Sequence, residues 1–74
     1  MQRVAVDFNS EEGRGTIVIT PQSVPPEGLF VGERVIIYEP DGDIECEAIV
    51  RHGIFDTWVA GFVEGTIRNP LLDG

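Results

Sequence analysis

Apolar and polar residues alternate along much of this chain, which is the pattern of short strands with one buried face. In residues 3–8, Val4, Val6 and Phe8 alternate with residues that are polar or small. Residues 15–20 are rich in β-branched side chains, which favour an extended backbone. Because turn-forming residues separate the two segments, we predict that they pair as a hairpin.

A second group of strands is expected after a loop at residues 21–30, where three prolines interrupt regular structure. Its members are residues 32–39, 44–51, 57–62 and a last short piece at 66–68. Pro40-Asp41-Gly42 lies between the first two members, and these residue types favour a tight turn. The sequence therefore predicts a second hairpin around this turn.

No segment has the apolar spacing of an amphipathic helix, so very little helix is expected. Five or six short strands in a flat sheet would leave two exposed edges, a problem that bending the sheet into a barrel removes. The predicted fold is all-β, a small and strongly bent antiparallel barrel. With 74 residues in total, residues 1–74 are predicted to form one domain.

One set of small and apolar positions surrounds the central turn. It consists of Gly32, Val35, Ile37, Gly42, Ala48 and Val50. This set resembles the hairpin of SH3-like small barrels, the group that includes Tudor, KOW and Agenet domains. The resemblance implies a fold and no specific activity. Tudor-type domains hold methylated lysine or arginine in an aromatic cage, but here the strand after the turn offers Ile44, Glu45, Cys46 and Glu47.

Aromatic residues elsewhere are candidates for a binding surface. Tyr38 and Phe55 would form one beside Asp56 if the loops bring them together, with Trp58 as a third aromatic ring. Trp58 itself is expected to pack in the core, because it shares an apolar face with Ala60 and Phe62.

Two predicted strands are apolar on both faces, although a small barrel buries only one face. The outward apolar side chains are those of Val18, Ile36, Ile49 and Val59. Either the loop at 21–30 and a tail with Leu71 and Leu72 cover this face, or a second copy of the chain does. Self-association would use Val18, Ile36 and Val59.

Thirteen carboxylates against five basic residues, all of them arginine, give a formal net charge of −8. This charge repels phosphate backbones and attracts cationic surfaces, so a basic protein or peptide is the expected partner and nucleic acid is not. The chain has no apolar run near the ~18 residues that a membrane span needs, so no membrane partner is expected. Arginine without lysine is typical of a GC-rich bacterial genome.

Carboxylates occupy every second position across the predicted second hairpin. This acidic ridge consists of Glu39, Asp41, Asp43, Glu45 and Glu47. Within a strand, this spacing places side chains on one face. Such a ridge is a solvated outer face, a contact for an arginine-rich partner or a cation site. The position of Gly42 does not fit a calcium-binding loop, and neither a metal nor a cofactor is expected.

The chain holds few groups suited to catalysis. Cys46 lies between two glutamates, whose charges disfavour a thiolate, so it is expected to be a packing residue. His52 adjoins Gly53 at a strand end, and Ser10 and Ser23 lie in polar loops without a motif. A single cysteine excludes an intramolecular disulfide, and no apolar signal region follows Met1, so a cytoplasmic location is expected.

These observations favour a non-enzymatic module for protein interaction or structure, which self-associates or binds a basic protein or peptide. The alternative is an acidic inhibitor that mimics nucleic-acid phosphates and blocks a basic site on an enzyme or toxin. An enzyme would require a pocket that joins His52 to a carboxylate.

Overall fold

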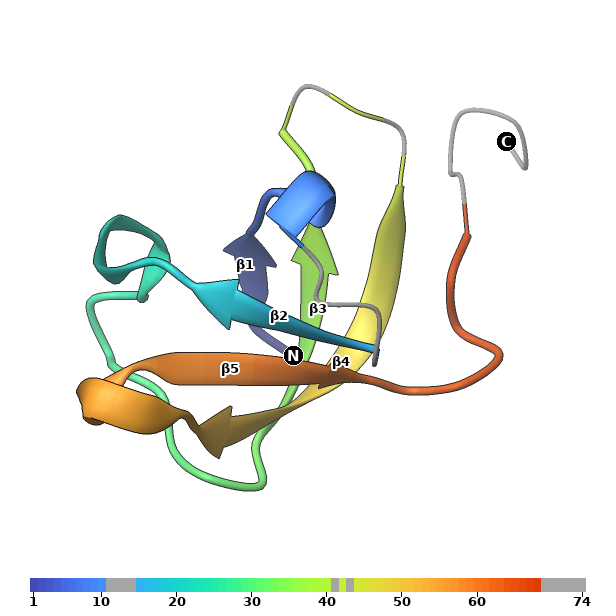
Figure 1. The fold of residues 1–74 in the computed structure, drawn as a ribbon. Coiled ribbons are helices and arrows are strands. Elements are labelled where there is room, and N and C mark those ends of the chain that lie inside the picture. Colours follow the sequence, from blue (N-terminus) through green and yellow to red (C-terminus); the bar gives the residue numbers. More distant parts are fainter. Residues whose placement is uncertain (11–14, 41, 43, 69–74) are drawn as a thin grey trace.

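Five strands form one curled sheet in the computed structural model, which describes residues 1–10, 15–40, 42 and 44–68 (Figure 1). The strands are β1 (Arg3–Ala5), β2 (Thr16–Ile19), β3 (Arg34–Tyr38), β4 (Glu45–His52) and β5 (Trp58–Phe62). Single turns of 3-10 helix connect them, namely η1 (Phe8–Ser10), η2 (Pro21–Ser23) and η3 (Ile54–Asp56). The prediction of an all-β, strongly bent fold is confirmed.

The centre of the sheet is a meander of β3, β4 and β5, each antiparallel to the next. Val35 pairs with Ala48 and Ile37 pairs with Cys46, so the predicted hairpin around residues 40–42 is confirmed. The sheet bends along this meander into a half-barrel, and the order of its strands is β1-β3-β4-β5-β2. β1 and β2 are therefore its two end strands.

The predicted hairpin between residues 3–8 and 15–20 is wrong. β1 instead runs parallel to β3, with Val4 opposite Ile37, so the sheet is mixed and not wholly antiparallel. After β1 the Val6 N–H still donates to the Tyr38 carbonyl at 2.8 Å, and the Asp7 side chain then accepts a hydrogen bond from the Asn9 N–H at 2.9 Å as the chain enters η1. β2 then pairs with β5, at the far side of the meander.

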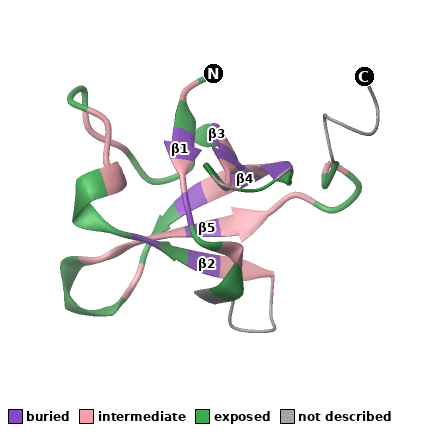
Figure 2. Cartoon of the chain, turned by 90° about the horizontal axis from the view of Figure 1, so that it is seen from above, coloured by how far each residue is buried: buried purple, intermediate pink, exposed green. Residues whose placement is uncertain are grey.

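The core lies on the concave face of the sheet, where buried positions alternate with more exposed ones (Figure 2). Its buried members are Val4, Val6, Ile17, Ile19, Val35, Ile37, Cys46, Ala48, Val50 and Ala60. Phe8, Trp58 and Phe62 are partly buried against this cluster. In β4 the predicted inward side chains Cys46, Ala48 and Val50 are buried, whereas Ile44, predicted on the same face just before the strand, is 38% exposed.

Part of the loop at residues 21–30 packs on the core. Its residues Val24 and Leu29 contact the core cluster. On the outer face Val18 is 36% exposed, while Ile36, Ile49 and Val59 are half-buried. Leu71 and Leu72, the other predicted cover, lie outside the described residues. No described segment forms a helix with the length and apolarity needed to cross a membrane.

Candidate functional site

A cleft of about 390 Å³ opens where the ladder of β2 and β5 ends. One wall comes from the end of β2 and from η2, and the other comes from η3 and the start of β5. Both helical turns lie at the same end of the molecule in Figure 1. The lining residues are Val18, Ile19, Thr20, Pro21, Val24, Phe55, Asp56, Thr57 and Trp58. The cleft is therefore mainly apolar, with Asp56 as its charged residue.

The tip of η3 has an unusual backbone. Phe55 and Asp56 have φ angles of 55° and 58°, in the left-handed region that side chains other than glycine rarely adopt. Hydrogen bonds hold the loop closed: Thr57 donates to the Ile54 carbonyl through its N–H at 3.1 Å and its hydroxyl at 2.7 Å. Such strain gathers at binding sites, where surrounding contacts maintain it.

Phe55 is the most exposed of the large hydrophobic side chains that the structure describes, at 92%. It projects from the strained tip beside the cleft and leaves an aromatic ring open to solvent. Trp58 is half-buried and gives the cleft a fixed wall, because the His52 ring stacks on it at 4.6 Å between centroids. The cleft thus combines the accessible ring of Phe55, the ring of Trp58 stacked on His52, and the carboxylate of Asp56.

The structure brings only part of the predicted aromatic and apolar surface together. Val18, Phe55 and Asp56 line the cleft, and Val59 pairs with Val18 across the ladder. Tyr38 lies elsewhere, at the end of β3, where the Arg3 guanidinium is 4.8 Å from its ring centroid. Ile36 is opposite Glu47 on the β3–β4 ladder and does not line the cleft.

Other residues that line the cleft were not predicted as binding residues, namely Ile19, Thr20, Pro21, Val24 and Thr57. Trp58, weighed as a third aromatic ring of the predicted surface, also lines the cleft. The sequence marks Pro21 only as a breaker of strands, and Trp58 as a core residue. Trp58 does pack partly against the core, as predicted. These residues meet at the cleft because β2 pairs with β5, a pairing that the local pattern did not indicate.

Within the acidic ridge, Glu45 is buried, with 7% of the residue exposed. Its carboxylate lies 3.3 Å from the Arg3 Nη1 and 3.5 Å from the Arg68 Nε. The backbone of Arg68 also pairs with that of Glu45, which confirms pairing within the short extended piece predicted at 66–68. Glu45 therefore joins two arginines of its own chain.

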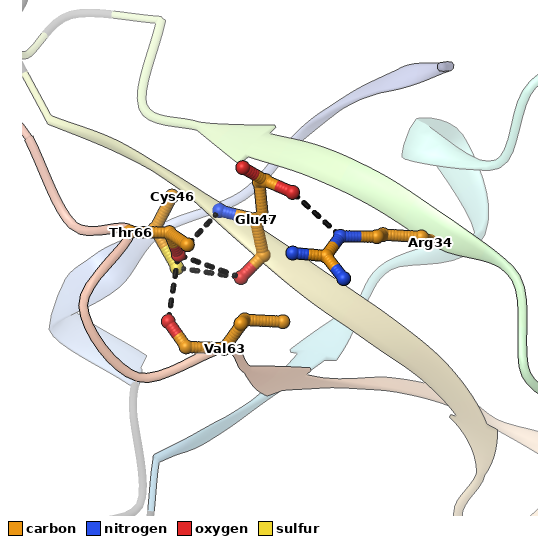
Figure 3. Close-up of polar contacts among 5 residues, drawn as sticks. All are labelled: Arg34, Cys46, Glu47, Val63 and Thr66. Atoms are coloured by element: carbon orange, nitrogen blue, oxygen red, sulfur yellow. Dashed lines mark hydrogen bonds and ion pairs between the residues drawn. The ribbon is translucent and has the colours of Figure 1, made fainter.

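The other ridge residues differ in their surroundings. Glu47 accepts a hydrogen bond from the Arg34 Nε at 2.5 Å (Figure 3). Glu39 is half-buried at the end of the hairpin, and its carboxylate lies over Gly42. Asp41 and Asp43 fall outside the described residues. Among the described residues, no three His, Cys, Asp or Glu side chains gather in a way that could hold a metal ion.

Cys46 is buried on the concave face, next to a side-chain bridge between β4 and the chain after β5 (Figure 3). The Thr66 hydroxyl accepts the Glu47 N–H at 3.0 Å and donates to the Val63 carbonyl at 2.6 Å. Burial raises the pKa of the Cys46 thiol, and the Glu47 charge raises it further, while hydrogen bonds to Thr66 and Val63 oppose the change. The folded protein therefore favours the thiol over the thiolate.

This preference predicts a loss of stability in alkali. Because the folded-state pKa of Cys46 lies above its ordinary value of 9.0, the thiol contributes stability below that pH and loses it as the pH rises further. The free energy of unfolding, measured with urea at neutral pH and at a pH above the ordinary thiol pKa, should fall more with rising pH in the wild type than in Cys46→Ala. Equal decreases in both proteins would contradict the prediction.

Among the described residues, none of the candidate catalytic side chains lines the cleft. His52 is exposed at the end of β4, where it stacks on Trp58. The Ser23 hydroxyl accepts a hydrogen bond from the Thr20 hydroxyl at 3.2 Å within η2. Comparison of the chain with protein-family models, curated proteins and solved structures gives no match.

Proposed function

We propose that the chain is a non-enzymatic interaction module that binds a basic segment of a partner protein in the cleft between η2 and η3. The observation that carries this proposal is the exposed Phe55 ring, held at a positive φ beside an apolar cleft that contains Asp56. A folded chain maintains strained and exposed groups of this kind chiefly where a ligand uses them.

The chemistry of the cleft suits the side chain of arginine or lysine. A cation is attracted to the faces of aromatic rings and to a carboxylate, here those of Phe55 and Asp56. The aliphatic stem of the same side chain would pack against apolar residues such as Val18 and Val24. One basic side chain would thereby use both the polar and the apolar parts of the lining.

The charge of the whole chain favours the same partner. A net charge of −8 attracts a basic segment over long range and speeds its encounter with the protein. Glu45 and Glu47 already form ion pairs with arginines of their own chain, so they are less available for direct contact than Asp56. We therefore assign the acidic ridge to steering and the cleft to binding.

We also propose that the chain belongs to the SH3-like small barrels and that it is cytoplasmic. The β3–β4 hairpin buries Val35, Ile37, Ala48 and Val50, which supports membership of the SH3-like small barrels suggested by the sequence. Cys46 is a buried free thiol, which supports a reducing, cytoplasmic environment.

The proposal is tested by titrating labelled protein with a short capped peptide in which arginine alternates with valine. Amide signals of Phe55 and Trp58 should shift, and Asp56→Asn should weaken binding about tenfold, equivalent to ~1.4 kcal/mol. Asparagine tolerates the positive φ at this position, so the variant removes the charge without forcing the backbone to change.

The matched control is Glu64→Gln, which removes one exposed carboxylate outside the cleft lining. It should leave affinity nearly unchanged, and a peptide with citrulline in place of arginine should bind weakly to every variant. Equal weakening by Asp56→Asn and Glu64→Gln would show that net charge alone attracts the peptide, and would contradict a specific site in the cleft.

A further inference from the structure

β2 is an end strand whose outward hydrogen-bonding groups are identified by the register. The Phe62 N–H donates to the Gly15 carbonyl at 2.7 Å, and Ile17 is opposite Ala60 two residues further along β2. In an antiparallel ladder, the backbone N–H and C=O groups of alternate residues point toward the partner strand, so those of Ile17 and Ile19 point toward β5. The N–H and C=O of Val18 therefore point away from β5, along the edge of the sheet.

The two end strands differ in how they discourage pairing with another chain. β1 carries Arg3, whose guanidinium contacts Glu45 and Tyr38 at that end of the sheet. β2 has the sequence Thr-Ile-Val-Ile and holds no charge, in a chain of which 24% is charged. Charged residues, prolines and bulges are the usual protection of an edge, and β2 has neither a charge nor a proline within its bounds.

Two hollows lie beside the Thr20 end of this strand. η1 lies at the opposite end of the ladder, where the Phe8 ring is 5.7 Å from that of Phe62. Thr20, which follows β2, lines a hollow of about 230 Å³ together with Ala5 and Asp7. Val18 and Thr20 also line the cleft that holds Asp56. Thr20, directly after β2, thus lines two hollows, each of which has a carboxylate in its lining.

We propose that the basic partner segment binds as an added strand along the edge of β2, with a side chain in the cleft. This inference rests on the proposed function and adds how the segment is held. Backbone hydrogen bonds to Val18 would supply affinity, and alternate side chains of the segment would lie beside Val18 and reach Phe55 and Asp56. A second copy of the chain is the less favoured occupant, since it would bring another net charge of −8 to the edge.

The test uses the arginine–valine peptide and a second version that is N-methylated at alternate residues. N-methylation removes the peptide donors that an added strand needs and keeps the same side chains. The unmodified peptide should slow amide exchange at Val18 at least tenfold, and N-methylation on the side facing the strand should weaken binding at least tenfold. Exchange at Arg3, on the other end strand, should not change.

Three results would overturn the inference. If Phe55 and Trp58 signals shift while Val18 exchange is unchanged and both peptides bind equally, the cleft binds the peptide without strand addition and the proposed function stands. If neither peptide shifts any signal at millimolar concentration, the proposed function fails and the inference fails with it. If Val18 becomes protected without peptide as protein concentration rises, a second copy occupies the edge.

Discussion

Ile37→Ala should lower the free energy of unfolding by about 3 kcal/mol, the cost of deleting most of a large side chain from a closed core. Ile37 is fully buried in β3, and its neighbours on the adjacent strands are Val4 and Cys46. The cavity would therefore lie where β1, β3 and β4 meet. A domain of this size has a small reserve of stability, so the variant should be largely unfolded at 37 °C.

The measurement is urea unfolding followed by Trp58 fluorescence and by circular dichroism. Ile36→Ala is the matched control, because it removes the same atoms from the next residue, which faces outward and is half-buried. We expect it to cost less than half as much. Similar losses in the two variants would mean that the concave face is not the main source of stability.

The second large effect is expected when Glu45 loses both of its cations. Arg3→Gln combined with Arg68→Gln would leave a buried carboxylate without the two guanidinium groups that lie within 3.5 Å of it. An uncompensated charge in such a position is strongly destabilising. Since both arginines are about half exposed, solvent moderates the effect, and we expect a loss of about 2 kcal/mol.

Restoring charge balance provides the internal control. Adding Glu45→Gln to the double variant removes the carboxylate and should recover more than half of the lost stability, measured by the same urea unfolding. Each single arginine replacement should cost clearly less than the pair, because the remaining arginine still faces Glu45. Absence of recovery in the triple variant would show that the arginines act through packing and not through charge.

Local patterns predicted the faces of the strands well. Val18, predicted to face outward, is exposed between the buried Ile17 and Ile19, and turn-forming residues correctly located the hairpin between β3 and β4. The pairing of the two outer strands could not be obtained in this way. Val4 and Ile37 are adjacent in space but distant in the chain, and alternation does not encode which strand a given edge will meet.

Only some of the residues that line the cleft could be predicted from the sequence, for a related reason. Phe55 and Asp56 were identified by residue type, whereas their strained backbone was not, because Gly53 is the nearby residue that would suggest a positive φ. Gly53 in fact has a φ of −100°, and a Cβ there would meet the Thr57 hydroxyl and the Val59 side chain. Glycine is thus needed for space, while the left-handed conformation falls on its neighbours.

The pairing of Ile17 with Ala60 also governs how the molecule assembles. The meander of β3, β4 and β5 joins strands that follow one another in the chain, so it can form early through short loop closures. β2 must wait for a contact that spans more than half the chain, and such high contact order slows folding. Because the two walls of the cleft belong to β2 with η2 and to η3 with β5, the proposed binding cleft is completed only at this late step. A ligand bound there would hold the early and late parts of the chain together and retard their separation.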